Sequence, residues 1–151
     1  MTSDIPVLDA GDYFLAMAAS EGYGYDLVSN LKLQKLVYYA QGFHLAIYSE
    51  PLFDGVIEAW NYGPVSPVLY YAKEKEGKGP LKPRAGYSSE MFSKKQRQLL
   101  DEVYEVYGQF SAWRLRDMVY GEPPWLNSDR GGIISHHDLK AYFETQVEGN
   151  E

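Results

Sequence analysis

One histidine and one glutamate in the central part of the chain could together perform acid–base chemistry. His44 falls on the apolar face of a predicted helix, and Glu58 follows in an aromatic, β-branched stretch. A histidine oriented by a carboxylate is a common form of general base. The same pair could equally be a buried hydrogen-bonded contact that fixes this stretch on the helix. No nucleophile or oxyanion site stands beside the pair in the sequence, so we favour the structural interpretation.

The other histidines do not predict a metal site. His136 and His137 are adjacent and precede Asp138, and neighbouring side chains on a helix do not face one another. The chain contains three histidines and no cysteine, which disfavours a closed zinc site and excludes disulfides and thiolate catalysis. The segments GKGP and DRGGII match neither a P-loop nor a dinucleotide fingerprint. We therefore expect no metal and no cofactor.

Aromatic side chains, several of them next to prolines, are the most concentrated chemical feature of the sequence. The chain has 14 tyrosines, and rigid aromatic side chains supply much of the binding energy of protein interfaces. Some of the bulky residues must belong to the core, and the remainder would form a protein-binding face. The residues concerned are Trp60, Tyr62, Pro64, Tyr70, Tyr71, Trp113 and Trp125.

About six helices must position these residues. Their apolar residues recur at helical spacing, and polar capping residues precede them. We predict that the second helix is central in the core, because it runs to about Tyr48 with a broad apolar stripe. Lys32, Lys35 and Gln41 should lie off that stripe. The predicted helix starts are Asp9 or Asp12, Ser29 or Asn30, Ser66, Ser93, Ser111 and Ser135.

The segment from 52 to 65 has a different pattern, which predicts a small β element. Val56 and Ile57 are β-branched, and the Gly63-Pro64 pair marks a turn. We predict one or two short strands, most simply a small hairpin that lies on the helices. The fold class is therefore mainly α, with a small β-hairpin or short sheet element.

Length and charge restrict the class further. A chain of 151 residues suits a single compact domain over 1–151, with a core of about 9–146 and a polar, disordered tail over 147–151. The loop over 75–91 lacks periodicity and should be the most flexible part.

The net charge of −7 disfavours nucleic acid as a partner, because phosphate backbones attract basic surfaces. No apolar run suits a membrane span or a signal peptide, so we expect a cytoplasmic protein.

The central block of the sequence resembles a known family. The run SNLKLQKLVYYAQGFHLAIYSEPLFD, followed by IEAWNYGPVSPVLY, is similar to the signature of the SocA-like, or Panacea, antitoxin domain, also labelled GepA-type phage-associated proteins. Downstream, EPPW and IISHHDLKAYF resemble its proline–tryptophan corner and closing helix, so the similarity extends from about Asp12 to Phe143. Phe43 stands where the family often has tryptophan. Tyr120 and Gly121 stand where it often has a histidine, which argues against a metal or catalytic role.

The resemblance implies a non-enzymatic role in a toxin–antitoxin system. Domains of this family neutralise a toxin encoded beside them, by direct binding or by passing the toxin to a protease. The implied partners are a cognate toxin protein and an ATP-dependent protease, and an acidic chain would suit a basic toxin. The residues of this chain that carry the motif are Lys35, Gln41, His44, Glu58, Trp60, Gly63 and Pro64.

Three functions therefore remain open. The first is an antitoxin, in which His44 and Glu58 lock the β element onto the second helix. The second is a small hydrolase or nucleotide-processing enzyme that uses the same two residues and places both at the floor of a wet pocket. The third is a nucleic-acid-binding regulator, which would bind DNA with a steep salt dependence. For the antitoxin, the expected partner-facing residues are Tyr62, Tyr70, Tyr71 and Trp125.

Overall fold

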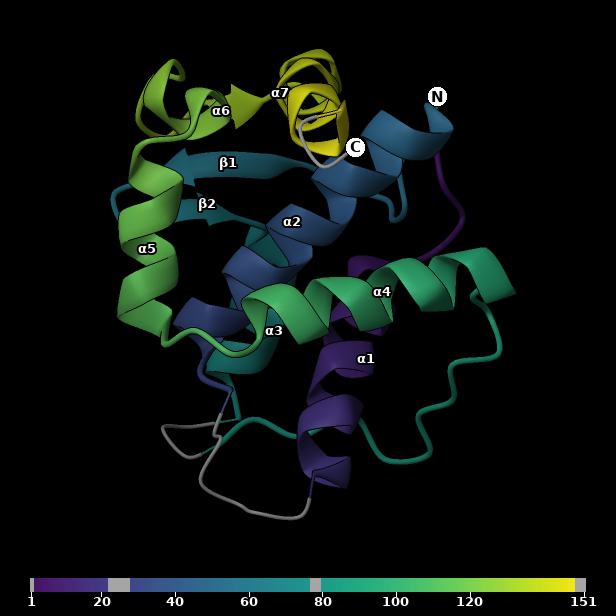
Figure 1. Ribbon diagram of the computed structural model, residues 1–151. Helices are drawn as coiled ribbons and strands as arrows, with labels where there is room; N and C mark the ends of the chain where they lie inside the picture. The colour runs from purple at the N-terminus through teal and green to yellow at the C-terminus, as the bar shows by residue number, and fades with distance from the viewer. Residues whose placement is uncertain (1, 22–27, 77–79, 149–151) are drawn as a thin grey trace.

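The computed structural model describes residues 2–21, 28–76 and 80–148. In these ranges the chain forms seven helices and a small three-stranded sheet (Figure 1). The helices are α1 Val7–Ser20, α2 Asn30–Tyr48, α3 Pro67–Glu74, α4 Lys94–Tyr107, α5 Ala112–Tyr120, α6 Pro123–Leu126 and α7 His136–Glu148. The strands are β1 Ile57–Trp60, β2 Gly63–Val65 and β3 Ile133–Ile134. The mainly helical class with a small sheet is confirmed, and α6 is a short helix beyond the six that the sequence predicts.

Helix α2 is the centre of the fold, as its apolar pattern predicts. Helices α1, α3, α4, α5 and α7 and strand β2 all pack on it (Figure 1). Every residue from 32 to 42 is buried, so the expectation that Lys32, Lys35 and Gln41 lie off the buried face is wrong. Neighbouring elements cover residues 32–42 on all sides, and the polar side chains of this part of the helix must therefore find partners inside the protein.

Close contact between α2 and α7 depends on a glycine. A Cβ atom at Gly42 would lie 2.2 Å from the ring of Phe143, which is far shorter than any non-bonded contact. The Phe143 ring is itself fully buried and packs edge-on against Tyr38 and Phe43. The absence of a side chain at Gly42 thus lets α7 approach the centre of α2.

Most helix starts follow their sequence signals. Serine side chains accept hydrogen bonds from backbone N–H groups at the starts of five helices, as expected of N-caps. At α4 the side chain of Gln96 also accepts from the Ser93 backbone, which completes a capping box. The five serines are Ser29, Ser66, Ser93, Ser111 and Ser135.

Helix α1 begins after Pro6 and not at Asp9 or Asp12. Asp12 is fully buried, where its carboxylate pairs with Lys73 at 2.8 Å and with Arg84 at 2.5 Å. Its charge is needed for these two ion pairs, which explains an aspartate inside a helix. Arg84 belongs to the loop expected to be the most flexible part, so this pairing ties that loop to α1.

The sheet has the strand order β2-β1-β3 and is antiparallel throughout. Strands β1 and β2 form the predicted hairpin, in which Trp60 pairs with Gly63 across a turn made by Asn61 and Tyr62. Strand β3 adds an edge that the sequence did not predict, because two residues are too short for a recognisable alternation. Its Ile134 pairs with Ile57 and fills the core. No helix in the described ranges is long and apolar enough to cross a membrane.

Candidate functional site

Four aromatic residues, two exposed and two half-buried, lie on and beside the turn between β1 and β2. Ring centroids of Trp60 lie 5.1 Å from Tyr70 and 5.9 Å from Tyr71, and the two tyrosines are 5.3 Å apart. Tyr62, on the turn itself, is 59% exposed, and Tyr71 is 54% exposed. We call Trp60, Tyr62, Tyr70 and Tyr71 the aromatic surface. Of the four residues that the sequence predicts to face a partner, Tyr70 and Tyr71 meet at Trp60, and Tyr62 lies on the adjacent turn.

The fourth nominated residue, Trp125, has a different position. It is half-buried, and its indole Nε1–H donates to the carbonyl oxygen of Trp60 at 2.7 Å. Its ring stacks on Tyr120 with centroids 4.5 Å apart, and the Arg130 guanidinium lies 3.6 Å from its centre. The Tyr120 hydroxyl also donates to the Asn61 carbonyl at 2.7 Å. Trp125 and Tyr120 therefore brace the hairpin turn from behind.

Side chains of α2 fix the rest of the motif in place. The amide oxygen of Gln41 accepts from the backbone N–H groups of Leu52 and Phe53, at 2.7 and 3.3 Å, and its Nε2 donates to the Phe53 carbonyl. About two helical turns before Gln41, the amide oxygen of Gln34 accepts a hydrogen bond from the backbone N–H of Ser66 at 2.9 Å. These buried amides hold the chain before β1 and after β2, so the intervening hairpin has little freedom.

Lys35 lies directly beneath the hairpin. Its side chain is fully buried, and its Nζ has no hydrogen-bond partner in the described part of the chain. A Cβ atom at Gly63, whose φ is +120°, would lie 3.1 Å from the Cε atom of Lys35. Burial, and then the nearby guanidinium of Arg116, lower the pKa of Lys35 to about 7. The sequence identifies Lys35 as a motif residue but gives no sign that its amine is enclosed.

The expected contact between His44 and Glu58 is not formed. The Nδ1 of His44 lies 2.5 Å from the Glu50 carbonyl oxygen, which can only accept, so Nδ1 carries the hydrogen. Its Nε2 lies 3.5 Å from the amide nitrogen of Gln96, and burial lowers its pKa. Glu58 instead accepts from the indole N–H of Trp60 within β1. His44 thus fixes the end of α2, whereas Glu58 orients an aromatic ring.

Sequence reasoning missed a half-buried carboxylate. Glu122 accepts hydrogen bonds from the hydroxyls of Tyr38 and Tyr39, at 2.9 and 2.8 Å. Burial raises the pKa of Glu122 to about 7, although the two tyrosine hydrogen bonds oppose that rise. The ring of Tyr39 stacks on Tyr107 with centroids 3.8 Å apart. The contact joins α2 to the start of α6, and its sequence signal is weak: two tyrosines in a helix and a glutamate before two prolines.

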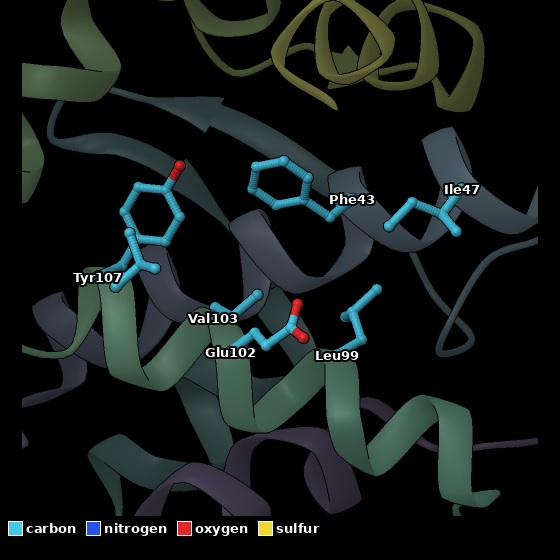
Figure 2. A pocket seen from close by; sticks show the side chains of 7 residues that line it. Phe43, Ile47, Leu99, Glu102, Val103 and Tyr107 are labelled. Atoms are coloured by element: carbon cyan, nitrogen blue, oxygen red, sulfur yellow. The ribbon is translucent and has the colours of Figure 1, made fainter. Parts of the chain in front are cut away.

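A second surface feature lies between α2 and α4, away from the residues of the motif's hairpin. It is an open cavity of about 170 Å³ with one carboxylate among apolar side chains (Figure 2). The sequence pattern assigns these apolar residues to core faces. Leu99 and Val103 are indeed buried, but Ile47 and Val106 are each 49% exposed. The lining residues are Phe43, Ile47, Leu99, Glu102, Val103, Val106 and Tyr107.

Within the described residues, no three histidine or acidic side chains come together in a way that could hold a metal ion. His137 and Asp138, adjacent in the sequence, are both highly exposed at the start of α7. They occupy the polar first turn of this helix.

Comparison with known proteins identifies the family. Residues 33–126 match the model of the antitoxin SocA-like, Panacea domain. Antitoxin SocA of Caulobacter vibrioides (strain NA1000 / CB15N) is 54% identical over 43 residues, which is 28% of this chain and 23% of that protein. No solved structure matches the chain significantly. The family model covers more than half of the chain and includes most of α2, the hairpin and the aromatic surface, so the chain belongs to the SocA-like Panacea antitoxin domain family.

Proposed function

We propose that this protein neutralises a cognate toxin by binding it directly, and that the aromatic surface makes the central contact. The observation that carries the proposal is the exposure of Tyr62 and Tyr71 on a rigidly held hairpin and helix. The family assignment supports an antitoxin role. The surface lies inside the part of the chain that matches the family.

The physical argument is one of preorganisation. A protein pays conformational entropy for each side chain and loop that becomes ordered on binding. Here the turn is already fixed by Trp125 and Tyr120, and Trp60 is oriented by Glu58. Tyrosine rings lose little entropy on binding and offer a large apolar area together with a hydroxyl group. A partner can therefore use the exposed rings at a low ordering cost.

The charge distribution adds a directional preference. The chain carries a net charge of −7, which would steer a basic toxin toward it. Arg116 and Arg130 lie next to Tyr120 and Trp125, behind the turn. A toxin that contacts the turn and reaches these two arginines would present an acidic group there.

The enzymatic alternative has less support. It requires His44 and Glu58 to act together, but each has a separate partner within the described residues. Neither residue lines the cavity between α2 and α4. We therefore propose a binding module in preference to a hydrolase or a nucleotide-processing enzyme.

Presentation of the toxin to an ATP-dependent protease is compatible with the same toxin contact. The two modes differ in the fate of the toxin, since direct neutralisation leaves an intact complex.

The test is co-expression with the neighbouring gene of the native locus. We expect that the neighbour alone arrests growth and that this chain relieves the arrest and co-purifies with it. Relief with loss of the neighbour's protein would instead indicate proteolysis.

Two variants test the surface in the same experiment. Tyr62→Ala with Tyr71→Ala should abolish relief and co-purification while the chain stays folded. Met91→Ala is the matched control, because Met91 is also exposed (41%) but lies in a loop outside the aromatic surface. If the double variant and Met91→Ala relieved growth arrest and co-purified with the neighbour to the same extent, the assignment of the aromatic surface would be refuted. Absence of any growth arrest by the neighbour would refute the antitoxin function for this pair of genes.

A further inference from the structure

We propose that the groove between α2 and α4 binds a helical segment of a partner protein that carries one large apolar side chain and, about one helical turn away, a lysine or arginine. The groove shares no residue with the aromatic surface. The proposal therefore stands independently of whether the toxin uses the aromatic surface.

The apolar part of the site is preformed and open. Ile47 and Val106 are each 49% exposed, and Phe43 is half-buried beside them. Leu99 and Val103 form a buried floor. The cavity of about 170 Å³ is close to the size of apolar cavities that hold one benzene-sized group. One leucine or phenylalanine side chain would fill it and would remove both exposed aliphatic residues from water.

The shape of the groove favours a helix as its occupant. On α2, Phe43 and Ile47 are separated by one turn, and on α4 the lining residues run from Leu99 to Val106 over two turns. Figure 2 shows the two rows facing each other across the gap. Two converging helical rows form the kind of groove into which a third amphipathic helix packs.

The charge of the groove specifies a cationic partner. Figure 2 shows the Glu102 carboxylate directed into the gap between the two helices. Glu102 is exposed and has no ion-pair partner within the described residues. An unpaired carboxylate at the edge of an apolar groove attracts a lysine or arginine whose neighbouring residue enters the cavity.

The charges along α4 support this inference independently. The helix begins with Lys94 and Lys95 and has Glu105 in its last turn. This order opposes the helix dipole, which favours acidic residues at the start and basic residues at the end. Helix stability therefore does not explain the acidic end of α4. A cationic side chain of a partner helix placed at Glu102, the one carboxylate that lines the groove, would neutralise part of it.

The test uses two synthetic helical peptides of about 18 residues, long enough to be helical with a leucine stripe. One has lysines and the other glutamates on its polar face. Fluorescence anisotropy with the full chain should show binding of the lysine peptide at micromolar concentrations and no binding of the glutamate peptide. Absence of binding of the lysine peptide would overturn the proposal.

Matched variants separate the groove from general electrostatic attraction. Glu102→Lys should weaken binding of the lysine peptide by about tenfold or more, and Glu102→Gln by less. Glu90→Lys makes the same charge change at an exposed position that does not line the groove and should change affinity less than about twofold, because salt screens exposed charges outside the site. Equal losses for Glu102→Lys and Glu90→Lys would mean non-specific attraction and would contradict the site.

The apolar contact is tested in the same way. Ile47→Ser with Val106→Ser should reduce affinity at least about tenfold, because one large side chain loses its cavity. Val68→Ser is the control, since Val68 is 60% exposed on α3.

Sedimentation of the wild type at several concentrations measures its oligomeric state and completes the test. A concentration-dependent dimer that Ile47→Ser dissolves would make a second copy the occupant and would overturn the proposal of a cationic partner.

Discussion

The indole N–H of Trp125 donates to the carbonyl oxygen of Trp60 at 2.7 Å, across 65 positions of the sequence. This bond joins α6 to the last residue of β1. It therefore couples the proline–tryptophan corner to the hairpin turn that carries Tyr62. Two motifs that are far apart in the chain thus form one structural unit beneath the aromatic surface.

The first prediction concerns this bond. Trp125→Phe keeps an aromatic ring against Tyr120 but removes the donor to the Trp60 carbonyl. We expect a loss of about 1 kcal/mol in the free energy of unfolding, measured by urea denaturation, as for a typical hydrogen bond. The control is Trp113→Phe, because Trp113 is 57% exposed and should change stability by less than about 0.5 kcal/mol. Equal effects of the two substitutions would show that the bond does not hold the turn.

The second prediction concerns Gln41, which satisfies three backbone groups of the chain before β1. Gln41→Leu is close in size but leaves the N–H groups of Leu52 and Phe53 buried without an acceptor. We expect the free energy of unfolding to fall by about 2–4 kcal/mol, the cost of leaving buried polar groups unpaired. Gln98→Leu on the exposed side of α4 is the control. Faster hydrogen exchange at the Leu52 amide should accompany the loss, and an unchanged exchange rate would contradict this role.

The third prediction is a pH dependence caused by Glu122. Its pKa is raised from 4.5 to about 7 in the folded state, so the folded protein binds more protons than the unfolded chain between these values. This contribution to stability is complete below pH 4.5 and is lost as the pH rises through 7. We expect it to fall by about 3 kcal/mol over this window, from the size of the shift.

Glu122→Gln isolates that contribution. Burial lowers the pKa of His44, which makes stability rise with pH near its titration and so opposes Glu122 in the wild type. The informative quantity is therefore the difference in unfolding free energy between wild type and Glu122→Gln at each pH. The unfolding free energy of Glu122→Gln minus that of the wild type should therefore increase from pH 4.5 to 7. A difference that does not change with pH would contradict the half-buried carboxylate.

The fourth prediction concerns the buried amine of Lys35, which has no hydrogen-bond partner among the described residues. Its pKa is lowered from 10.5 to about 7, so its contribution to stability is present above pH 10.5 and is lost as the pH falls through 7. Lys35→Met removes the amine but keeps an unbranched, apolar side chain that ends at the Cε position. We expect the variant to be more stable than the wild type by about 2 kcal/mol or more at pH 7, because an unsatisfied buried polar group is removed. Thermal unfolding that shows a less stable variant would mean that the amine has a favourable partner.

Local signals explain what the sequence predicts well. The capping box of Ser93 and Gln96 spans three residues, and the hairpin turn lies within a few positions of Gly63. Both features depend on neighbouring residues, so pattern reasoning recovers them. The central place of α2 was also predictable, because a long apolar helix in a domain of this size must be in the core.

Long-range partners explain what the sequence does not predict. Tyr38 and Glu122 are 84 positions apart, and nothing near either residue marks the contact. Lys35 falls outside the i, i+3, i+4 apolar spacing of α2, and it is buried because other elements pack around that helix. Apolar spacing also cannot tell whether another element covers a residue. It therefore gave no sign that Ile47 and Val106 would line an open groove.

The most direct test of the antitoxin function is the affinity of the purified chain for the neighbouring gene product, compared between wild type and Tyr62→Ala with Tyr71→Ala. We predict that the wild type forms a stable complex and that the double variant, with an unchanged unfolding midpoint, binds at least about 100-fold more weakly, as for the loss of two interface hot spots. Unchanged affinity of the double variant would contradict the assignment of the aromatic surface. No binding by the wild type would contradict direct neutralisation of that toxin.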